Sequence, residues 1–435
     1  MYRGQASPSR GRYGLRRAPV LGREHVAMLS QCGAAGPGYT SGPNVPMSRL
    51  LRVLSALLAG ALGLVLIGEA PARAYPQWQL SSGAVRCNQC HYAPAGGGLL
   101  TSYGRDAAGD QLSTFGGNGE FLHGAVALPS WFALGGDFRG AFVANDVQAP
   151  NGPTVAVFPM QADLYARVGL PAGFSLNATG GFRGQVRNPD LAVPAQDYQP
   201  VSTSELISRE HYAMWEPSAL GPYVRAGRFF TPFGLRFAEH NFYIRRDLGL
   251  DQLEETYNVS GGFIYDAWEL HVSLFAPDFV RHIGSNEQGV AALFAGRLAD
   301  DHVELAAQTR LAVGPGVTRF IFGGYGKLYV ERLRSLLFAE VDGVQLLFND
   351  PSVGSRGQVI GLAGFTVLPI PGVMLTLLGE RNQIDVAFND AWTAADALIN
   401  WFPYAHVEAQ VVGRLQFPTG GEVAKTLFIQ LHYFL

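Results

Sequence analysis

From Trp131 to the C-terminal Leu435, apolar and polar residues alternate with a period of two, and this pattern restricts the fold more than any other feature. Because successive side chains of a strand point to opposite faces, such alternation predicts strands with one apolar and one polar face. In the run 160–170 one face carries Ala162, Leu164, Ala166, Val168 and Leu170, and the other carries Gln161, Asp163, Tyr165 and Arg167. A short turn at 171–173 and a second alternating run from Phe174 complete a predicted hairpin.

The alternation recurs at 303–313 and 405–415, where Glu, Gln, His and Arg residues oppose Val, Leu and Ala residues. A soluble β-sandwich also alternates, but its outer faces would carry more Lys and Glu. A polar face rich in Arg, Gln and Tyr fits a water-filled lumen better, with the apolar face toward lipid. These runs therefore favour a membrane barrel over a soluble β-protein.

Composition agrees with an all-β fold, a transmembrane antiparallel β-barrel. Only 15% of the residues are charged, against about 25% in soluble globular chains. No run of eighteen or more apolar residues occurs outside the N-terminal region, which argues against a bundle of membrane-spanning helices. About sixteen period-two segments fit between Trp131 and Leu435, with fourteen to eighteen as the range, and a barrel of that size is expected to enclose an aqueous lumen. The net charge of −3 gives no electrostatic reason to expect nucleic acid.

The last strand and the irregular segments fit the same fold. Residues 427–435 alternate in a pattern that resembles the C-terminal recognition strand of bacterial outer-membrane proteins, although those usually end in Phe or Trp and this chain ends in Leu435. Segments 188–200 and 348–357 are rich in Pro, Gly or acidic residues and are predicted as longer external loops. The stretch 225–236 resembles a strand-turn region of anion-selective porins, and we expect its arginines to pair with lumenal acids rather than to line a pore.

The N-terminal region is predicted to direct secretion. Residues 47–74 combine a basic start, an apolar run and the small-residue site Ala72-Arg73-Ala74, which predicts a signal peptide cleaved after Ala74. The apolar run is shorter than the roughly 20 residues that span a bilayer, so a retained anchor is the weaker alternative. Residues 1–46 are predicted as a disordered leader or a mis-assigned start upstream of Met47. Secretion places the mature chain in an oxidising compartment.

The two cysteines of the predicted mature chain belong to the motif Cys87-Asn88-Gln89-Cys90-His91, which has the C-x-x-C-H spacing of covalent haem attachment. In such a motif two thiols form thioethers with the haem vinyl groups, and the adjacent imidazole binds the iron as proximal ligand. A redox dithiol, a disulfide and half of a zinc site are the alternatives, but neither a βαβ context nor further nearby ligands accompany the motif. We therefore predict one covalently bound haem c.

Other haem contacts are less constrained by the sequence. Between Tyr75 and Ser130 there is no Met, and His123 is the only other His, so it is the first candidate for the distal iron ligand. Lumen-facing His271, His406 and His432 are rivals, and an ordinary surface histidine is the alternative for His123. Arg105 is a candidate contact of a haem propionate, with a solvated turn arginine as the alternative. The haem-binding segment 75–130 is too short to bury much surface alone, so we expect it to pack against the barrel at 131–435.

A signal peptide, one C-x-x-C-H motif close behind it and a barrel without further cysteine together resemble the fused monohaem cytochrome and porin proteins of iron-oxidising bacteria. Pro94 and Gly104-Arg105 are a looser match to the residues after the haem motif in that family. The resemblance implies a haem plug at or inside an outer-membrane barrel of a Gram-negative bacterium. It also implies electron transfer between an external donor or acceptor, such as Fe(II), and periplasmic c-type cytochromes. The run Gly96 to Gly98 departs from that family and leaves the donor open.

Three functions therefore compete. The first is an electron conduit through the haem, with at most an Fe(II):cytochrome c oxidoreductase type of activity. The second is a passive porin with a periplasmic haem-bearing appendage, and the third is a soluble periplasmic β-protein with haem. No nucleophile arrangement, phosphate-binding loop or isolated carboxylate pair suggests hydrolysis.

Overall fold

The computed structural model describes residues 79–81, 84–145, 154–183, 205–239, 241–251, 254–279, 286–388 and 390–435. The predicted leader 1–46, the predicted signal peptide 47–74 and the predicted loop 188–200 lie outside the described residues. Among the described residues, no helix has the length and apolar character needed to cross a membrane.

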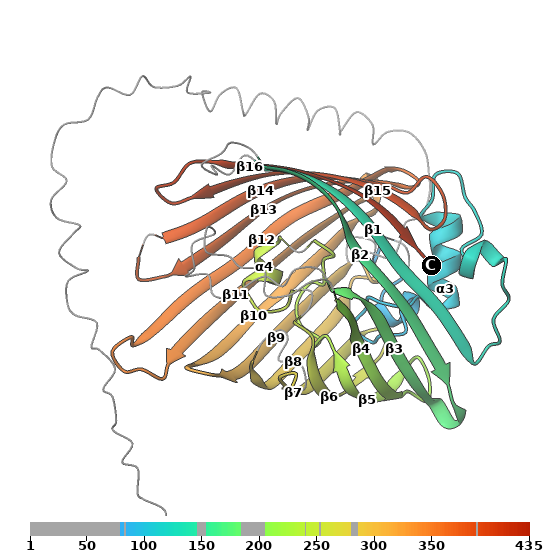
Figure 1. Cartoon of the computed structure of the whole chain (residues 1–435), viewed down its shortest axis with the longest axis horizontal. Helices are drawn as coiled ribbons and strands as arrows, with labels where there is room; N and C mark the ends of the chain where they lie inside the picture. The colour runs from blue at the N-terminus through green and yellow to red at the C-terminus, as the bar shows by residue number, and fades with distance from the viewer. Residues whose placement is uncertain are drawn as a thin grey trace, which may run out of the picture. The chain divides into compact units, whose positions relative to one another are not determined.

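Sixteen antiparallel strands form a closed barrel, each paired with the next along the chain and β1 paired with β16 (Figure 1). This confirms the predicted fold and strand number. The strands are β1 (Phe132–Asn145), β2 (Thr154–Gly169), β3 (Phe174–Arg183), β4 (Glu205–Trp215), β5 (Gly221–Phe229), β6 (Thr256–Ile264), β7 (Trp268–Ala276), β8 (Gln288–Leu298), β9 (Val303–Gly314), β10 (Val317–Val330), β11 (Ser335–Phe348), β12 (Ser355–Ile370), β13 (Val373–Asp385), β14 (Asp390–Trp401), β15 (Val407–Pro418) and β16 (Ala424–Phe434).

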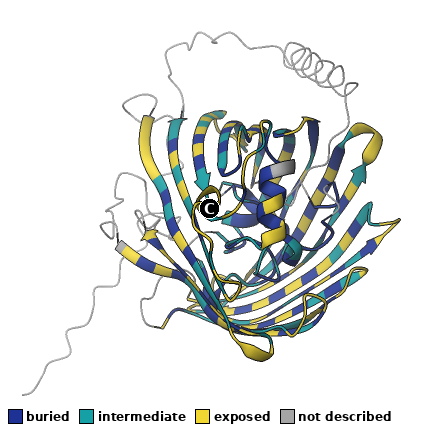
Figure 2. Cartoon of the chain, turned by 90° about the vertical axis from the view of Figure 1, so that its right-hand side faces the viewer, coloured by how far each residue is buried: buried dark blue, intermediate teal, exposed yellow. Residues whose placement is uncertain are grey.

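The alternation in sequence becomes an alternation of exposure, visible as bands along the strands in Figure 2. In β2, Gln161, Asp163 and Tyr165 are buried toward the lumen, whereas Leu164 is 62% exposed on the outside. Strands β3, β9, β15 and β16 follow the same rule. An outer face of exposed aliphatic and aromatic side chains is what contact with lipid requires.

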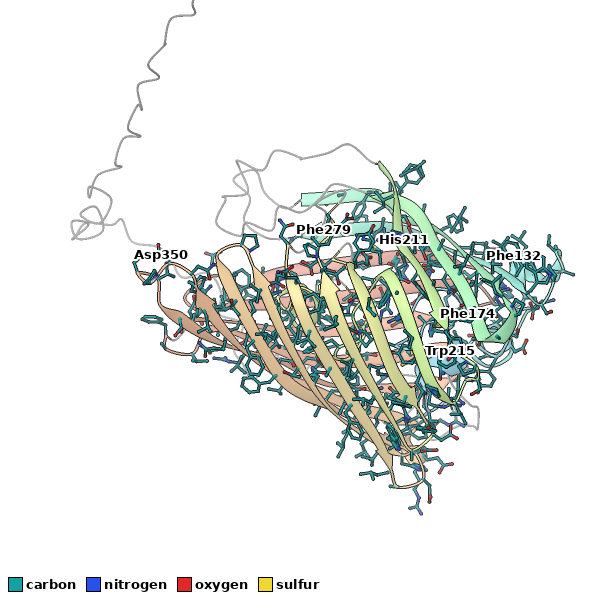
Figure 3. The ribbon with its side chains drawn as sticks, turned by 90° about the horizontal axis from the view of Figure 1, so that it is seen from below. Phe132, Phe174, His211, Trp215, Phe279 and Asp350 are labelled. Atoms are coloured by element: carbon teal, nitrogen blue, oxygen red, sulfur yellow. The ribbon has the colours of Figure 1, made fainter. Side chains whose placement is uncertain are left out.

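The two ends of the barrel differ in their connections. Tight turns such as Pro371-Gly372 join β12 to β13 at one end, called here the short-turn end, which also carries the C-terminus (Figure 1). Phe174 and Trp215 mark this end in Figure 3, whereas Phe279 and Asp350 mark the opposite end. The longest connection in the described part of the chain joins β5 to β6 and starts from the opposite end. Its described residues, 230–239, 241–251 and 254–255, are called here the inward loop.

The inward loop packs inside the barrel and carries the short helix α4 (Tyr243–Arg246). Its apolar side chains form a cluster with inward-facing residues of β8 and β10–β15, among them Leu293, Ile321, Phe338, Ile360, Leu362, Leu378 and Leu398. The expected water-filled lumen is therefore partly replaced by a packed apolar core. The physical reason is that this wall presents aliphatic side chains inward as well as outward, and burying them excludes water.

The N-terminal segment, described at residues 79–81 and 84–130, occupies the mouth at the short-turn end (Figures 1 and 2). Along it follow α2 (Cys87–Cys90), α3 (Ser102–Asp106), the π-helical turn η1 (Ala107–Gln111) and the 3-10 turn η2 (Phe121–Gly124). Backbone hydrogen bonds join it to the β14–β15 turn: Thr114 N–H donates to the Phe402 carbonyl at 2.8 Å and Phe115 N–H to that of Pro403 at 2.9 Å. The segment thus packs against the barrel, as its short length predicted.

Candidate functional site

The C-x-x-C-H motif forms a single helical turn. Cys87 to Cys90 make up α2, and His91 N–H donates to the Cys87 carbonyl at 3.0 Å. The Gln89 side chain accepts from the Val85 and Arg86 amides at 2.7 and 2.9 Å, which satisfies amides at the start of the helix. Helical spacing brings the two cysteines and the histidine onto adjacent positions of one turn, as the attachment chemistry requires.

The residues after the motif hold this turn in place. Thr101 N–H donates to the Cys90 carbonyl at 2.9 Å, and its hydroxyl donates to the Gln89 carbonyl at 2.6 Å. Gly104 on α3 lies so close that a Cβ there would overlap the Cys90 carbonyl. Gly96 packs beside Cys87 and His91 with a φ of +79°, a conformation that favours glycine. The Gly104 of the family resemblance therefore has a packing role in this chain.

Polar contacts fix the motif to the turns at the short-turn end. The Arg86 guanidinium lies 2.9 Å from the Asp266 carboxylate in the β6–β7 turn. The Asn88 amide donates to the Ala219 carbonyl in the β4–β5 turn at 2.8 Å. These contacts place the motif at the wall of the mouth rather than on a separate domain.

Deeper contacts tie the same segment to a charged column on the inner wall. Gln79 donates to Glu304 at 2.9 Å and accepts from Lys327 at 2.6 Å. Glu304 also pairs with Lys327 at 2.7 Å and with Arg297 at 3.0 Å, and Arg297 reaches Glu269 at 2.9 Å. Every charge of this buried column thus has an opposite charge within 3 Å, as burial demands.

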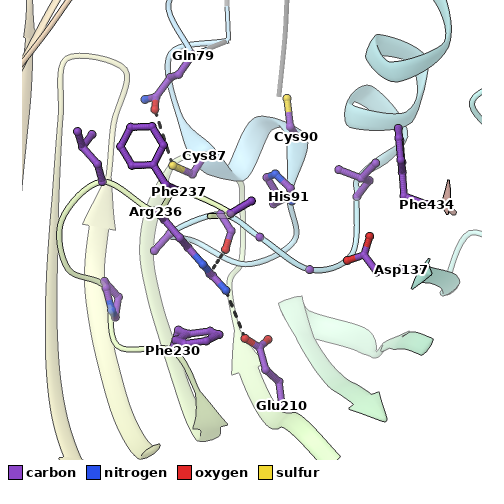
Figure 4. Close-up of a pocket in the computed structure, with 18 of the residues that line it drawn as sticks. Gln79, Cys87, Cys90, His91, Asp137, Glu210, Phe230, Arg236, Phe237 and Phe434 are labelled. Carbon is purple, nitrogen blue, oxygen red and sulfur yellow. Dashed lines mark hydrogen bonds and ion pairs between the residues drawn. The ribbon is translucent and has the colours of Figure 1, made fainter. Parts of the chain in front are cut away.

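The motif borders a cavity of about 310 Å³ inside the barrel (Figure 4). Cys87, Cys90 and His91 line it together with Gly96 to Gly98, inward-facing residues of β1–β4, β7, β8 and β10, the inward loop and the C-terminal residues. Its size is within the range of small-molecule and cofactor sites, which is roughly 300–1,000 Å³. The two insertions into the barrel meet here, because the Arg236 guanidinium of the inward loop donates to the Gly96 carbonyl.

The chemistry of the donor set fits a haem c. Cys87 and Cys90 carry separate thiols rather than a disulfide. Burial, and next the Glu269 carboxylate, raise the pKa of the Cys87 thiol to about 12, so the thiol is neutral rather than a reactive thiolate. Two thiols and an imidazole on one turn beside a cavity are the groups that would attach and ligate this cofactor. Cys87 and Cys90 would hold the vinyl-derived carbons, and His91 would hold the iron.

Two of the predicted haem contacts lie away from this cavity. His123 is exposed at the mouth, where it contacts the Tyr433 hydroxyl at 3.2 Å and the edge of the His406 ring at 4.5 Å between centroids. Arg105 is buried against the Leu134 carbonyl and lies 3.9 Å from Glu120. Neither residue lines the cavity, and nor does His406. The distal-ligand candidate and the propionate candidate thus lie outside the lining of the cavity that His91 borders.

Two of the rival histidines, His271 on β7 and His432 on β16, do line the cavity. His432 has both ring nitrogens close to carboxylates, with Asp137 at 2.6 Å and Glu408 at 2.8 Å. His271 places one nitrogen 2.8 Å from the Tyr223 hydroxyl and the other 3.7 Å from Glu269. His271 is the less tightly held of the two.

Sequence reasoning missed the part that the inward loop plays in the site. Arg236 belongs to the singled-out stretch 225–236, but its position beside the motif depends on a loop that folds back into the lumen. Arg245 and Gln79 also line the cavity and carry no local signal. The expected pairing of arginines with acids holds for Arg228, which lies 3.3 Å from Glu255.

No family model and no curated protein matches the chain. Solved structures do. An outer-membrane-expressed OmpT of Vibrio cholerae matches with a TM-score of 0.55 and 10% identity, covering 71% of this chain and 100% of that one. An anion-selective porin from Comamonas acidovorans matches with a TM-score of 0.50 and 8% identity, covering 70% and 99%. The chain has a porin-like fold. At these identities the likeness concerns the barrel alone.

Proposed function

We propose that this protein resides in the outer membrane and transfers electrons through one covalently bound haem c held in the mouth of its barrel. The observation that carries the proposal is the shared cavity of Cys87, Cys90 and His91 inside a porin-like barrel. Haem iron supplies one-electron chemistry by alternating between the ferric and ferrous states. The protein's part is to attach the group, to orient it through His91 and to limit its contact with water.

The position of the motif in the barrel favours one side of the membrane. Bacterial outer-membrane barrels have short periplasmic turns and longer extracellular loops. The motif is bound to the short turns through Arg86 and Asn88. The haem would therefore lie at the periplasmic mouth, within reach of periplasmic c-type cytochromes or other redox carriers. An external donor or acceptor, with Fe(II) as one candidate, would exchange electrons from the other side.

A passive porin with a haem-bearing segment is the second candidate. The porin-like fold favours it, since solved neighbours of this barrel include an anion-selective porin. Against it stand the two insertions, because the inward loop fills part of the lumen with an apolar cluster and the N-terminal segment occupies the mouth. Solute passage would require one of these insertions to move.

The first test is a haem-stained denaturing gel of outer-membrane fractions with boiled and unboiled samples. We expect a haem-positive band that shifts on boiling for the natural chain. The double variant Cys87→Ala/Cys90→Ala should give the same shift without haem, because neither cysteine belongs to a strand. Covalent haem retained in the double variant would refute the attachment site, and a natural chain without haem would refute the electron-transfer proposal.

The second test separates the two candidate functions. Proteoliposomes with cytochrome c enclosed would receive an impermeant ferrous chelate outside, and reduction of the enclosed cytochrome would be followed by absorbance. The electron conduit predicts reduction with the natural chain and none with Cys87→Ala/Cys90→Ala. The passive porin would instead be supported if the natural chain and the double variant gave equal solute conductance in planar bilayers and equal reduction of the enclosed cytochrome c.

A further inference from the structure

We propose that Arg236 and Arg245 of the inward loop form a carboxylate-binding site in the cavity and hold the propionates of the haem. This inference rests on the proposed haem attachment at Cys87 and Cys90. It transfers the propionate contact from Arg105, which does not line the cavity, to two residues that do.

Arg245 is a buried cation without an ionic partner in the described part of the chain. It lies on α4, is 8% exposed and lines the cavity. None of the described carboxylates lies within ion-pair distance of its guanidinium, and the acids that act on it electrostatically, Asp251 first, are farther away. Burial, and then the neighbouring Arg236, lower the pKa of Arg245 to about 10. A buried charge of this kind is costly unless an anion joins it.

Arg236 connects this cation to the haem motif. Its guanidinium donates to the Gly96 carbonyl, and Gly96 packs beside Cys87 and His91. A Cβ at Gly97 would meet the same guanidinium at 2.6 Å, so the glycine run leaves room for it. Arg236 reaches one carboxylate, that of Glu210, only at 3.7 Å (Figure 4). Hydrogen-bonding capacity for an anion therefore remains on this side chain.

Both guanidiniums lie over the same aromatic ring. Arg236 is 4.7 Å and Arg245 is 5.5 Å from the centroid of Phe230, which also lines the cavity. The ring stabilises the two cations and sets their orientation without neutralising them. Two like charges held together by one ring are expected to attract a ligand with negative oxygens, because planar guanidinium groups bind carboxylates through paired hydrogen bonds.

Three other cations of the cavity each have a carboxylate within 3 Å. Arg209 lies 2.8 Å from Asp163, Lys327 lies 2.7 Å from Glu304, and Arg86 lies 2.9 Å from Asp266. Arg236 and Arg245 differ from these three cations, because no described carboxylate lies that close to either guanidinium. A carboxylate could come from the haem propionates or from a carboxylate solute, and proximity to Cys87 and His91 favours the propionates.

The test compares Arg236→Gln, Arg245→Gln and their double variant with the natural chain, and Arg332→Gln in the exposed β10–β11 turn serves as control. The haem midpoint potential is measured by spectroelectrochemical titration, and covalent haem is measured separately on gels. Positive charge near the haem stabilises the ferrous state. Removing both arginine charges should therefore lower the equilibrium constant for haem reduction by about tenfold or more, which is a fall of 59 mV in the midpoint potential for one electron. The control should match the natural chain.

Intact haem with an unchanged potential in the double variant would overturn the inference while leaving the proposed function standing. Absence of haem from the natural chain would instead overturn the proposed function. If the Gln variants lose the heat-shifted band, the corresponding Arg→Lys variants are measured instead. These variants keep the positive charge, so their midpoint potential should stay close to that of the natural chain. A shift in potential as large as that expected for the Gln variants would overturn the site.

A further arm distinguishes the propionates from a solute. Benzoate binding is measured calorimetrically in the natural chain and in Cys87→Ala/Cys90→Ala. Binding that depends on both arginines and occurs only in the haem-free variant would support the propionates as the natural occupant. Equal, arginine-dependent binding to both proteins would show that the site takes a solute and would overturn the inference.

Discussion

At the residue scale, the C-x-x-C-H motif can be found in the sequence because its residues are close together along the chain. Cys87, Cys90 and His91 lie within five consecutive positions and fall on one helical turn in the structure. The remaining cavity residues come from separate strands and loops, so spacing along the chain cannot reveal them. Nearness in sequence favours His123 as the distal ligand, yet the fold brings His271 and His432 to the cavity instead.

A tight glycine contact gives the first prediction. Gly104→Ala places a Cβ against the Cys90 carbonyl, a backbone atom that cannot rotate away. We expect overpacking of about 1–3 kcal/mol, which would displace α3 and reduce haem loading. Haem absorbance per protein measures this, with Gly413→Ala as control because that Cβ would meet open space. Normal loading in Gly104→Ala would contradict the assigned packing role.

A buried histidine at the mouth gives a pH prediction. Burial lowers the pKa of His406 below its ordinary value, and the neighbouring His123 acts in the same direction. The unfolded chain therefore takes up the proton more readily, so this residue lowers stability as the pH falls through about 6.5 toward the folded pKa. We expect the loss of stability between pH 7.5 and 5.5 to be smaller in His406→Gln, measured by urea unfolding. An equal loss in both proteins would exclude this contribution.

At the scale of elements, the strands were predictable and the inward loop was not. Period-two alternation predicts which face of each strand meets lipid, as in β2, β3, β9, β15 and β16. The loop carries no such signal, because Phe233, Leu235 and Phe237 pack on strand residues more than fifty positions away in sequence. Its place in the lumen depends on partners that only the closed barrel brings together.

Removing a side chain from the apolar cluster should weaken the packing of the inward loop inside the lumen. Phe242 is fully buried in that cluster, with its ring 5.3 Å from that of Phe237. Phe242→Ala should cost about 3–5 kcal/mol of packing, while the strand hydrogen bonds that close the barrel remain. We expect higher single-channel conductance in planar bilayers. Phe388→Ala, at a residue 70% exposed, is the control, and equal conductance in both variants would mean that the loop does not block the lumen.

At the scale of the whole molecule, the segment with the C-x-x-C-H motif and the inward loop enter one barrel from opposite ends and meet inside it. That arrangement makes the orientation of the barrel decisive for the proposed function, because electrons can reach periplasmic carriers directly only if the short-turn end faces the periplasm.

Cysteine labelling can establish the orientation. Ser352 is exposed in the β11–β12 loop and Ser218 is exposed in the β4–β5 turn at the short-turn end. We expect an impermeant maleimide to label Ser352→Cys in intact cells, and to label Ser218→Cys only after the outer membrane is permeabilised. The natural cysteines provide the background and should stay unlabelled once they are joined to haem. The reverse pattern would place the haem motif at the cell surface, where its direct partner would be the external donor rather than a periplasmic cytochrome.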